Sequence, residues 1–77
     1  MNYGETHVNL EKILAEKNIS KNQLSRDLLI DRSVVTNYCK NRMKRLDISL
    51  LNKFCCYLGV DYGELLTYTA PDKEENK

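Results

Sequence analysis

The 77-residue sequence predicts a small all-α domain built from five short helices. Leu, Lys, Glu and Asn are abundant, and only one Pro and three Gly interrupt the chain. Apolar residues recur three and four positions apart, as on one face of a helix. The alternation of apolar and polar residues that is typical of a strand is approached only at the end of the last expected helix. A helix-start signal also appears four times. We expect one domain of modest stability, because a chain of this length buries only about 60% of its unfolded surface.

The helix-start signal consists of a capping residue with an apolar residue before it and another four positions after it. At Ser20, Gln23 follows as the return half of a capping box, and Ile19 and Leu24 form a hydrophobic staple. These signals predict the starts of four helices. The remaining three are Asp31 between Ile30 and Val35, Asp47 between Leu46 and Leu51, and Asp61 between Val60 and Leu65, where Glu64 completes a second box.

The first three helices are expected over residues 9–17, 21–28 and 32–40. Eleven residues separate Ser20 from Asp31, which leaves room for one short helix and a tight turn. This is the spacing of a helix-turn-helix formed by the second and third helices. Positions expected to face inward are Leu10, Ile13 and Leu14 in the first helix, Leu24 and Leu28 in the second, and Val35, Tyr38 and Cys39 in the third.

The fourth and fifth helices are expected over residues 48–58 and 62–67. Gly59 is placed to end the fourth helix in a left-handed conformation. The inward positions are Ile48, Leu51, Phe54, Cys55 and Leu58 in the fourth helix, with Leu65 and Leu66 in the fifth.

We expect residues 9–69 to form the domain, residues 1–8 to be a flexible N-terminus, and residues 70–77 to be a polar disordered tail. The N-terminal residues have neither a basic start nor an apolar run, so no signal peptide or membrane segment is predicted. A cytoplasmic location is therefore expected.

The three cysteines do not suggest a disulfide framework or a zinc site. Their number is odd, two of them are adjacent, and none has the spacing of a metal-binding pair. Cys39 and Cys55 are expected to act as small apolar residues, leaving Cys56 as the most exposed thiol. Oxidant sensing by the adjacent pair is the alternative, although no neighbouring residue obviously favours a thiolate.

Positive charge is concentrated in the middle of the sequence. Residues 1–19 carry two Lys against three Glu, giving −1, and residues 46–77 carry three Lys against six acids, giving −3. Residues 20–45 carry seven Lys and Arg against two Asp, giving +5. A segregated basic region is typical of a polyanion-binding surface, although many basic faces are only solvated.

The third predicted helix has an outward face suited to entering a groove. With Val35, Tyr38 and Cys39 inward, its remaining residues project away from the core. That face has no long acidic side chain and no large apolar patch. It consists of Ser33, Thr36, Asn37 and Lys40, with Arg32 at the exposed first turn and Val34 on the flank.

The segments ISKNQLSRDLLIDRSVVTNYCKN and LDISLLNKFCCYLGVDYGELL resemble the Cro and phage-repressor helix-turn-helix family, the xenobiotic-response-element type regulators. The resemblance implies a compact five-helix, lambda-repressor-like DNA-binding domain. Three positions depart from the family pattern: Ser25 replaces a common Ala, Lys21 replaces a common Gln, and Leu29 replaces the turn Gly. A left-handed Leu29 would be destabilising by about 1–2 kcal/mol.

The resemblance also implies which residues contact DNA. In such proteins the third helix lies in the major groove, while the second helix and the loop after the third meet phosphates. Carried over by position, the base-contacting residues are Arg32, Ser33, Thr36 and Asn37. The phosphate-contacting residues are Lys21, Lys40, Asn41, Arg42, Lys44 and Arg45.

We therefore expect a sequence-specific transcriptional regulator, a repressor, that binds double-stranded DNA as a homodimer and associates with the nucleoid when bound. The segment from the fifth helix onward, with Tyr57, Tyr62 and Tyr68, is the expected dimer surface. The alternative is a protein-interaction module of the same fold, such as an antitoxin or a repressor partner. An enzyme is the poorest interpretation, and no catalytic residue, cofactor, metal or small-molecule ligand is expected.

Overall fold

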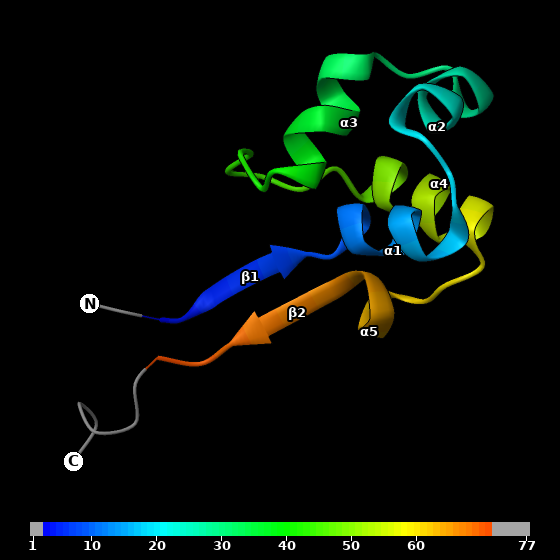
Figure 1. The fold of residues 1–77 in the computed structure, drawn as a ribbon. Helices are drawn as coiled ribbons and strands as arrows, with labels where there is room; N and C mark the ends of the chain where they lie inside the picture. Colours follow the sequence, from blue (N-terminus) through cyan, green and yellow to red (C-terminus); the bar gives the residue numbers. More distant parts are fainter. Residues whose placement is uncertain (1–2, 72–77) are drawn as a thin grey trace.

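The computed structural model describes residues 3–71 and contains all five predicted helices (Figure 1). Four of them begin at the predicted residue, because the local start signals were correctly identified. Two short strands, which were not predicted, lie at the ends of the described chain. The elements are β1 (Glu5–Val8), α1 (Leu10–Lys17), α2 (Lys21–Leu28), α3 (Arg32–Cys39), α4 (Ile48–Leu58), α5 (Tyr62–Leu65) and β2 (Leu66–Thr69).

Side-chain caps start three of the helices. The Ser20 hydroxyl accepts the Gln23 N–H at 3.0 Å, and the Asp47 carboxylate accepts the Leu50 N–H at 3.3 Å. Asp61 and Glu64 form the predicted capping box. Asp31 occupies the N-cap position of α3, but its side chain makes no capping bond. Each cap satisfies an N–H group that has no partner inside the helix.

The prediction of an all-α fold is wrong at the two ends of the domain. Instead of a flexible segment, Glu5–Val8 forms a strand that pairs antiparallel with Leu66–Thr69. The fifth helix ends at Leu65, two residues earlier than predicted, because the chain becomes extended at Leu66. The register aligns Glu5 with Thr69, Thr6 with Tyr68, His7 with Thr67 and Val8 with Leu66. β-Branched and aromatic residues suit this extended conformation once a partner strand is present.

One apolar core joins the helices to the strand pair, and most of the predicted core is confirmed. Phe54 lies at its centre and meets the Tyr38 ring edge-on, with ring centroids 5.5 Å apart. Val8 is also buried, which the sequence did not predict. Ile48 is 60% exposed and was wrongly placed in the core. It is the first residue of α4, and its neighbours Leu46 and Leu50 pack against the core instead.

The helices place α3 on one side of the molecule and the strand pair on the other (Figure 1). In this view α2 and α3 lie above α1 and α4, and β1 and β2 extend away from the helices as an arm. The segment between α3 and α4 passes close to β1. A tight turn joins α2 to α3, closed by the Ser25 hydroxyl, which donates to the Ile30 carbonyl at 2.5 Å.

A left-handed leucine lies in this turn. Leu29 has φ of 56° and ψ of 48°, and its side chain is 90% exposed. A Cβ atom is strained in this conformation, and an exposed side chain gains little from burial. The Leu29 N–H bonds to the Arg26 carbonyl and the Ile30 N–H to the Ser25 carbonyl, so the end of α2 is satisfied despite the strain.

Replacing Leu29 with glycine should raise the free energy of unfolding by about 0.5–1 kcal/mol, because the left-handed strain exceeds the entropy that glycine adds to the unfolded chain. Urea unfolding of the two proteins measures this difference. Leu29→Ala is the control, since it removes the exposed side chain and keeps the strained Cβ. A glycine variant no more stable than the alanine variant would contradict the strain.

A second test concerns the link between α4 and α2. The Tyr57 hydroxyl donates to the Asp27 carboxylate, and this bond raises the pKa of Tyr57 above its ordinary value. The folded state therefore holds the phenolic proton more tightly, so the stabilisation is present below about pH 10 and is lost as the pH rises through the raised pKa. The stability gap between the parent and Tyr57→Phe should narrow between about pH 8 and pH 11 in urea unfolding. A gap that widened would refute the assignment.

Candidate nucleic-acid interface

The orientation of α3 determines the face that the domain offers to a ligand. Val35, Tyr38 and Cys39 are all buried, as predicted. The opposite side exposes Arg32, Ser33 and Asn37, whereas Thr36 is half-buried. Three of the four predicted base-contacting residues therefore have accessible side chains, and Thr36 lies at the margin of the exposed face.

Lys21 and Arg32 lie together although eleven residues separate them in the sequence. Both line a shallow groove of about 320 Å³ where the N-termini of α2 and α3 meet α1. Lys21 is half-buried, and its ammonium nitrogen lies 3.9 Å from a carboxylate oxygen of Glu11. An ion pair this long and this exposed adds little stability, so the Lys21 ammonium is only weakly held.

The segment between α3 and α4 separates its cations from its apolar residues. Met43 and Leu46 are half-buried against the core. The basic residues of this segment, and Lys40 at the C-cap of α3, are exposed to solvent. We call them the loop cations. They are Lys40, Arg42, Lys44 and Arg45, and all four are exposed.

The Asn41 side chain, which the resemblance assigned to a phosphate contact, is bonded to β1 in the structure. Its Oδ1 accepts the Val8 N–H at 2.6 Å, and its Nδ2 donates to the Val8 carbonyl at 3.1 Å. The side-chain amide thus imitates one residue of a neighbouring strand on the outer edge of β1. The Asn41 backbone is left-handed, with φ of 57°, a conformation that asparagine tolerates better than most residues.

Both ends of the loop are tied to the fold. At the α3 end, Asn41 holds β1, and the Arg42 N–H bonds to the Asn37 carbonyl at 2.9 Å. At the α4 end, the Asp47 N–H donates to the buried Tyr38 hydroxyl at 3.0 Å. The loop cations are therefore presented beside α3 by a braced backbone.

The sequence profile of the Cro/C1-type HTH DNA-binding domain matches residues 9–71, which is most of the chain. The chain belongs to this family. Membership confirms the resemblance drawn from the sequence and makes the chain a DNA-binding domain.

Two solved structures share the fold of this Cro/C1-type domain. A Bacteroides fragilis protein provisionally described as DNA-binding is 21% identical, with a TM-score of 0.74, and the match covers 82% of this chain and 100% of that one. The transcriptional regulator VanUg is 19% identical, with a TM-score of 0.71, over 92% of this chain and 93% of its own. No curated protein sequence matches significantly.

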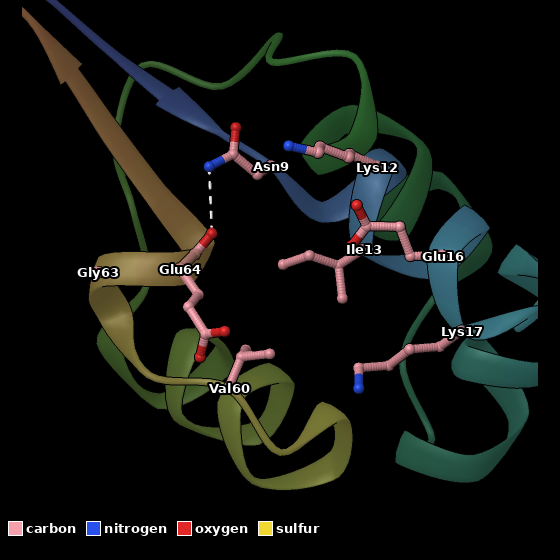
Figure 2. A pocket seen from close by; sticks show the side chains of 8 residues that line it. All are labelled: Asn9, Lys12, Ile13, Glu16, Lys17, Val60, Gly63 and Glu64. Atoms are coloured by element: carbon pink, nitrogen blue, oxygen red, sulfur yellow. Dashed lines mark hydrogen bonds between the residues drawn. The ribbon is translucent and has the colours of Figure 1, made fainter.

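The pocket in Figure 2 lies away from α3, between α1 and the α5 region of this Cro/C1-type domain. It has a volume of about 380 Å³, and its lining mixes Lys12 and Lys17 with Glu16 and Glu64. At one side of the pocket, the Asn9 side-chain amide donates to the Glu64 carbonyl at 3.1 Å (Figure 2). Its charges balance, so it has no excess positive charge to attract a polyanion.

The cysteines take no part in the α3 face. All three are free thiols, and Cys56 is the exposed one, as predicted. Burial raises the pKa of Cys39, and burial followed by the nearby Asp61 raises the pKa of Cys55, so both thiols stay protonated. Within residues 3–71, no three His, Cys, Asp or Glu side chains gather as metal ligands. No helix in the same range could cross a bilayer.

Sequence reasoning missed the structural role of Asn41 and the burial of Val8. The available signal was the position of Asn41 just after a predicted helix, where asparagine often takes a left-handed conformation. Its bonding partner lies 33 residues earlier in a segment that the sequence placed outside the domain. Nothing local to either residue indicated that contact.

Replacing Asn41 tests the link between the loop and β1. Asn41→Ala should lower the free energy of unfolding by about 2–3 kcal/mol, because two hydrogen bonds are lost and a left-handed alanine is strained. Asn41→Gly loses the same bonds without the strain, so it should be about 1 kcal/mol more stable than Asn41→Ala. Thermal or urea unfolding measures both values. Two variants indistinguishable from the parent would contradict the bracing role.

Proposed function

We propose that α2 and α3 form the helix-turn-helix, and that α3 enters the major groove of double-stranded DNA to regulate transcription. The observation that carries this proposal is the two-sided character of α3. Its inner side chains are buried, and its outer side offers Arg32, Ser33 and Asn37 beside the loop cations. A helix of this kind can present base-reading groups while its neighbours hold the backbone.

The exposed side chains of α3 have distinct capacities for reading bases. Arg32 can bond to O6 and N7 of guanine, Asn37 can pair with adenine, and Ser33 can donate or accept. The half-buried Thr36 contributes through its methyl group, which suits a thymine methyl. Arg32 lies at the first turn, where the N-terminal end of a recognition helix meets the bases.

Phosphate contacts are assigned to Lys21 and to the loop cations. The weak pairing of Lys21 with Glu11 leaves its ammonium free to exchange a carboxylate for a phosphate. The braced loop backbone presents its four exposed cations directly after the C-terminal end of α3. Together they give five cations per subunit for the DNA backbone.

We also propose that the regulator is a homodimeric repressor that binds a pseudo-palindromic operator. One recognition helix touches only a few base pairs, so two half-sites about 10–10.5 bp apart supply the specificity that one lacks. A dimer seated on an operator blocks access by other proteins. The fold shared with VanUg, named as a transcriptional regulator, is consistent with this role.

Fluorescence-anisotropy binding to random-sequence duplex DNA across a salt series tests the DNA-binding face without knowledge of the operator. Five phosphate contacts predict a log-log slope of about −4 to −5 for one subunit, and about twice that for a dimer. Absence of binding even at low salt would reject the proposal and favour the protein-interaction alternative, for which partner capture would be the next experiment.

Once an operator has been selected from a random pool, Arg32→Ala should lose about 1–3 kcal/mol of discrimination at one position of each half-site. Arg42→Ala is the matched control. It should weaken binding to all sequences alike and reduce the salt slope by about one per subunit. Unchanged discrimination in Arg32→Ala would remove Arg32 from the base-reading residues.

A further inference from the structure

We propose that the free edge of β2 pairs antiparallel with the same edge of a second copy of this chain, forming a four-stranded sheet across the dimer. This inference deepens the proposed function and rests on the homodimer stated there. The two-stranded arm has two edges, and an edge with unpaired N–H and C=O groups is a template for another strand. The hydrogen-bonding pattern decides which edge is open.

The alternation of hydrogen bonds shows which backbone groups point outward. Both backbone groups of Val8 bond to Asn41, so the pair Val8–Leu66 has its N–H and C=O groups turned away from the partner strand. The Asn9 N–H bonds inward to the Leu65 carbonyl at 2.7 Å, one position further along. In an antiparallel pair such positions alternate. Leu66, Tyr68 and Ala70 therefore turn their backbone groups to the outer edge of β2.

The edge of β1 is unsuitable for a second strand. The Asn41 amide covers the outward groups of Val8, and the neighbouring loop residues Met43 and Lys44 line a groove against Thr6. Glu5 also places a carboxylate on this strand. Charge and a covering loop are the usual means by which an edge strand avoids pairing.

The edge of β2 has neither protection. Its sequence from Leu66 to Ala70 carries no charge. The Leu66 N–H donates to the Tyr62 carbonyl at the end of α5. The outward backbone groups of Tyr68 and Ala70 have no hydrogen-bond partner within residues 3–71. The free groups are thus two donors, on Tyr68 and Ala70, and three acceptors, on Leu66, Tyr68 and Ala70.

These free groups are self-complementary. In an antiparallel pair centred on Tyr68, each Tyr68 N–H donates to the partner's Tyr68 carbonyl, and each Ala70 N–H donates to the partner's Leu66 carbonyl. The arrangement uses both free donors of each copy. The Ala70 carbonyl faces the partner's Leu66 N–H, which is already committed to Tyr62, and gains no bond across the pair. Because the same patch serves both copies, the contact closes with two-fold symmetry, as a dimer on a palindromic site requires.

The Tyr68 side chain allows a charge-swap test. It is 63% exposed, and its hydroxyl donates to the Tyr3 carbonyl at 2.5 Å, so its replacement leaves the core intact. In the proposed pairing the two copies of residue 68 lie directly opposite each other, where like charges repel. Tyr68→Lys and Tyr68→Glu should each dimerise about five- to tenfold more weakly than the parent. An equimolar mixture should recover to within about threefold of the parent.

Sedimentation velocity across a concentration series measures these dissociation constants, and far-UV circular dichroism confirms that each variant is folded. Thr67→Lys and Thr67→Glu are the matched controls, because residue 67 lies opposite the partner's Thr69 and not opposite itself. Their mixture should recover clearly less than the mixture of residue 68 variants, because the two copies of residue 67 are only diagonal neighbours. A parent protein that stays monomeric, or a mixture of residue 68 variants without recovery, overturns the proposal.

Disulfide cross-linking gives a second readout in a Cys56→Ser background. Directly opposed residues on paired strands have Cα atoms about 5.5 Å apart, within the range that a disulfide bridges. Tyr68→Cys should therefore form a covalent dimer on mild oxidation, and Thr67→Cys should form at least about fivefold less. Equal cross-linking at both positions overturns the register.

The salt series separates this inference from the proposed function, because random-sequence DNA binding uses α3 and the loop cations. Charge-swap recovery without any DNA binding supports the β2 pairing and rejects the DNA-binding role. DNA binding by a protein that never pairs through β2 supports the helix-turn-helix and rejects this dimer.

Discussion

The burial of three α3 side chains is the constraint on which the rest of the structure depends. Val35, Tyr38 and Cys39 enter the core together, and this packing stabilises an eight-residue helix that is too short to be stable in water by itself. Their burial turns Arg32, Ser33 and Asn37 to solvent. Tyr38 extends this control beyond the helix, because its ring packs on Phe54 and its hydroxyl holds the start of α4. The candidate interface is thus a consequence of core packing.

The strand arm connects the two ends of the domain to the same interface. β1 buries Val8 and receives the Asn41 amide, so the loop that carries four cations is braced by the N-terminal segment. That brace occupies the outer edge of β1 and leaves β2 as the open edge. One side-chain amide therefore influences both the position of the loop cations and the surface available for a second copy.

Local strain is tolerated in the turn between α2 and α3 because the surrounding bonds are complete. Leu29 takes the left-handed conformation that suits glycine, and it gains no burial in return. The Ser25 hydroxyl closes the turn on the Ile30 carbonyl, so the residue that replaced a common alanine supplies a bond that alanine lacks. The turn thus keeps its geometry with an unusual pair of residues.

The sequence by itself determined the five helices and the inner and outer sides of α3, because caps, staples and helical periodicity act within a few neighbouring residues. It also identified the exposed loop cations from the segregation of charge. Only the tertiary structure decided the strand pair, the bracing role of Asn41 and the exposure of Ile48. Each strand has four residues whose partners lie about 60 positions away, so neither carries a recognisable local signal. Ile48 follows the helical pattern of α4, but Leu46 and Leu50 cover the core at that end.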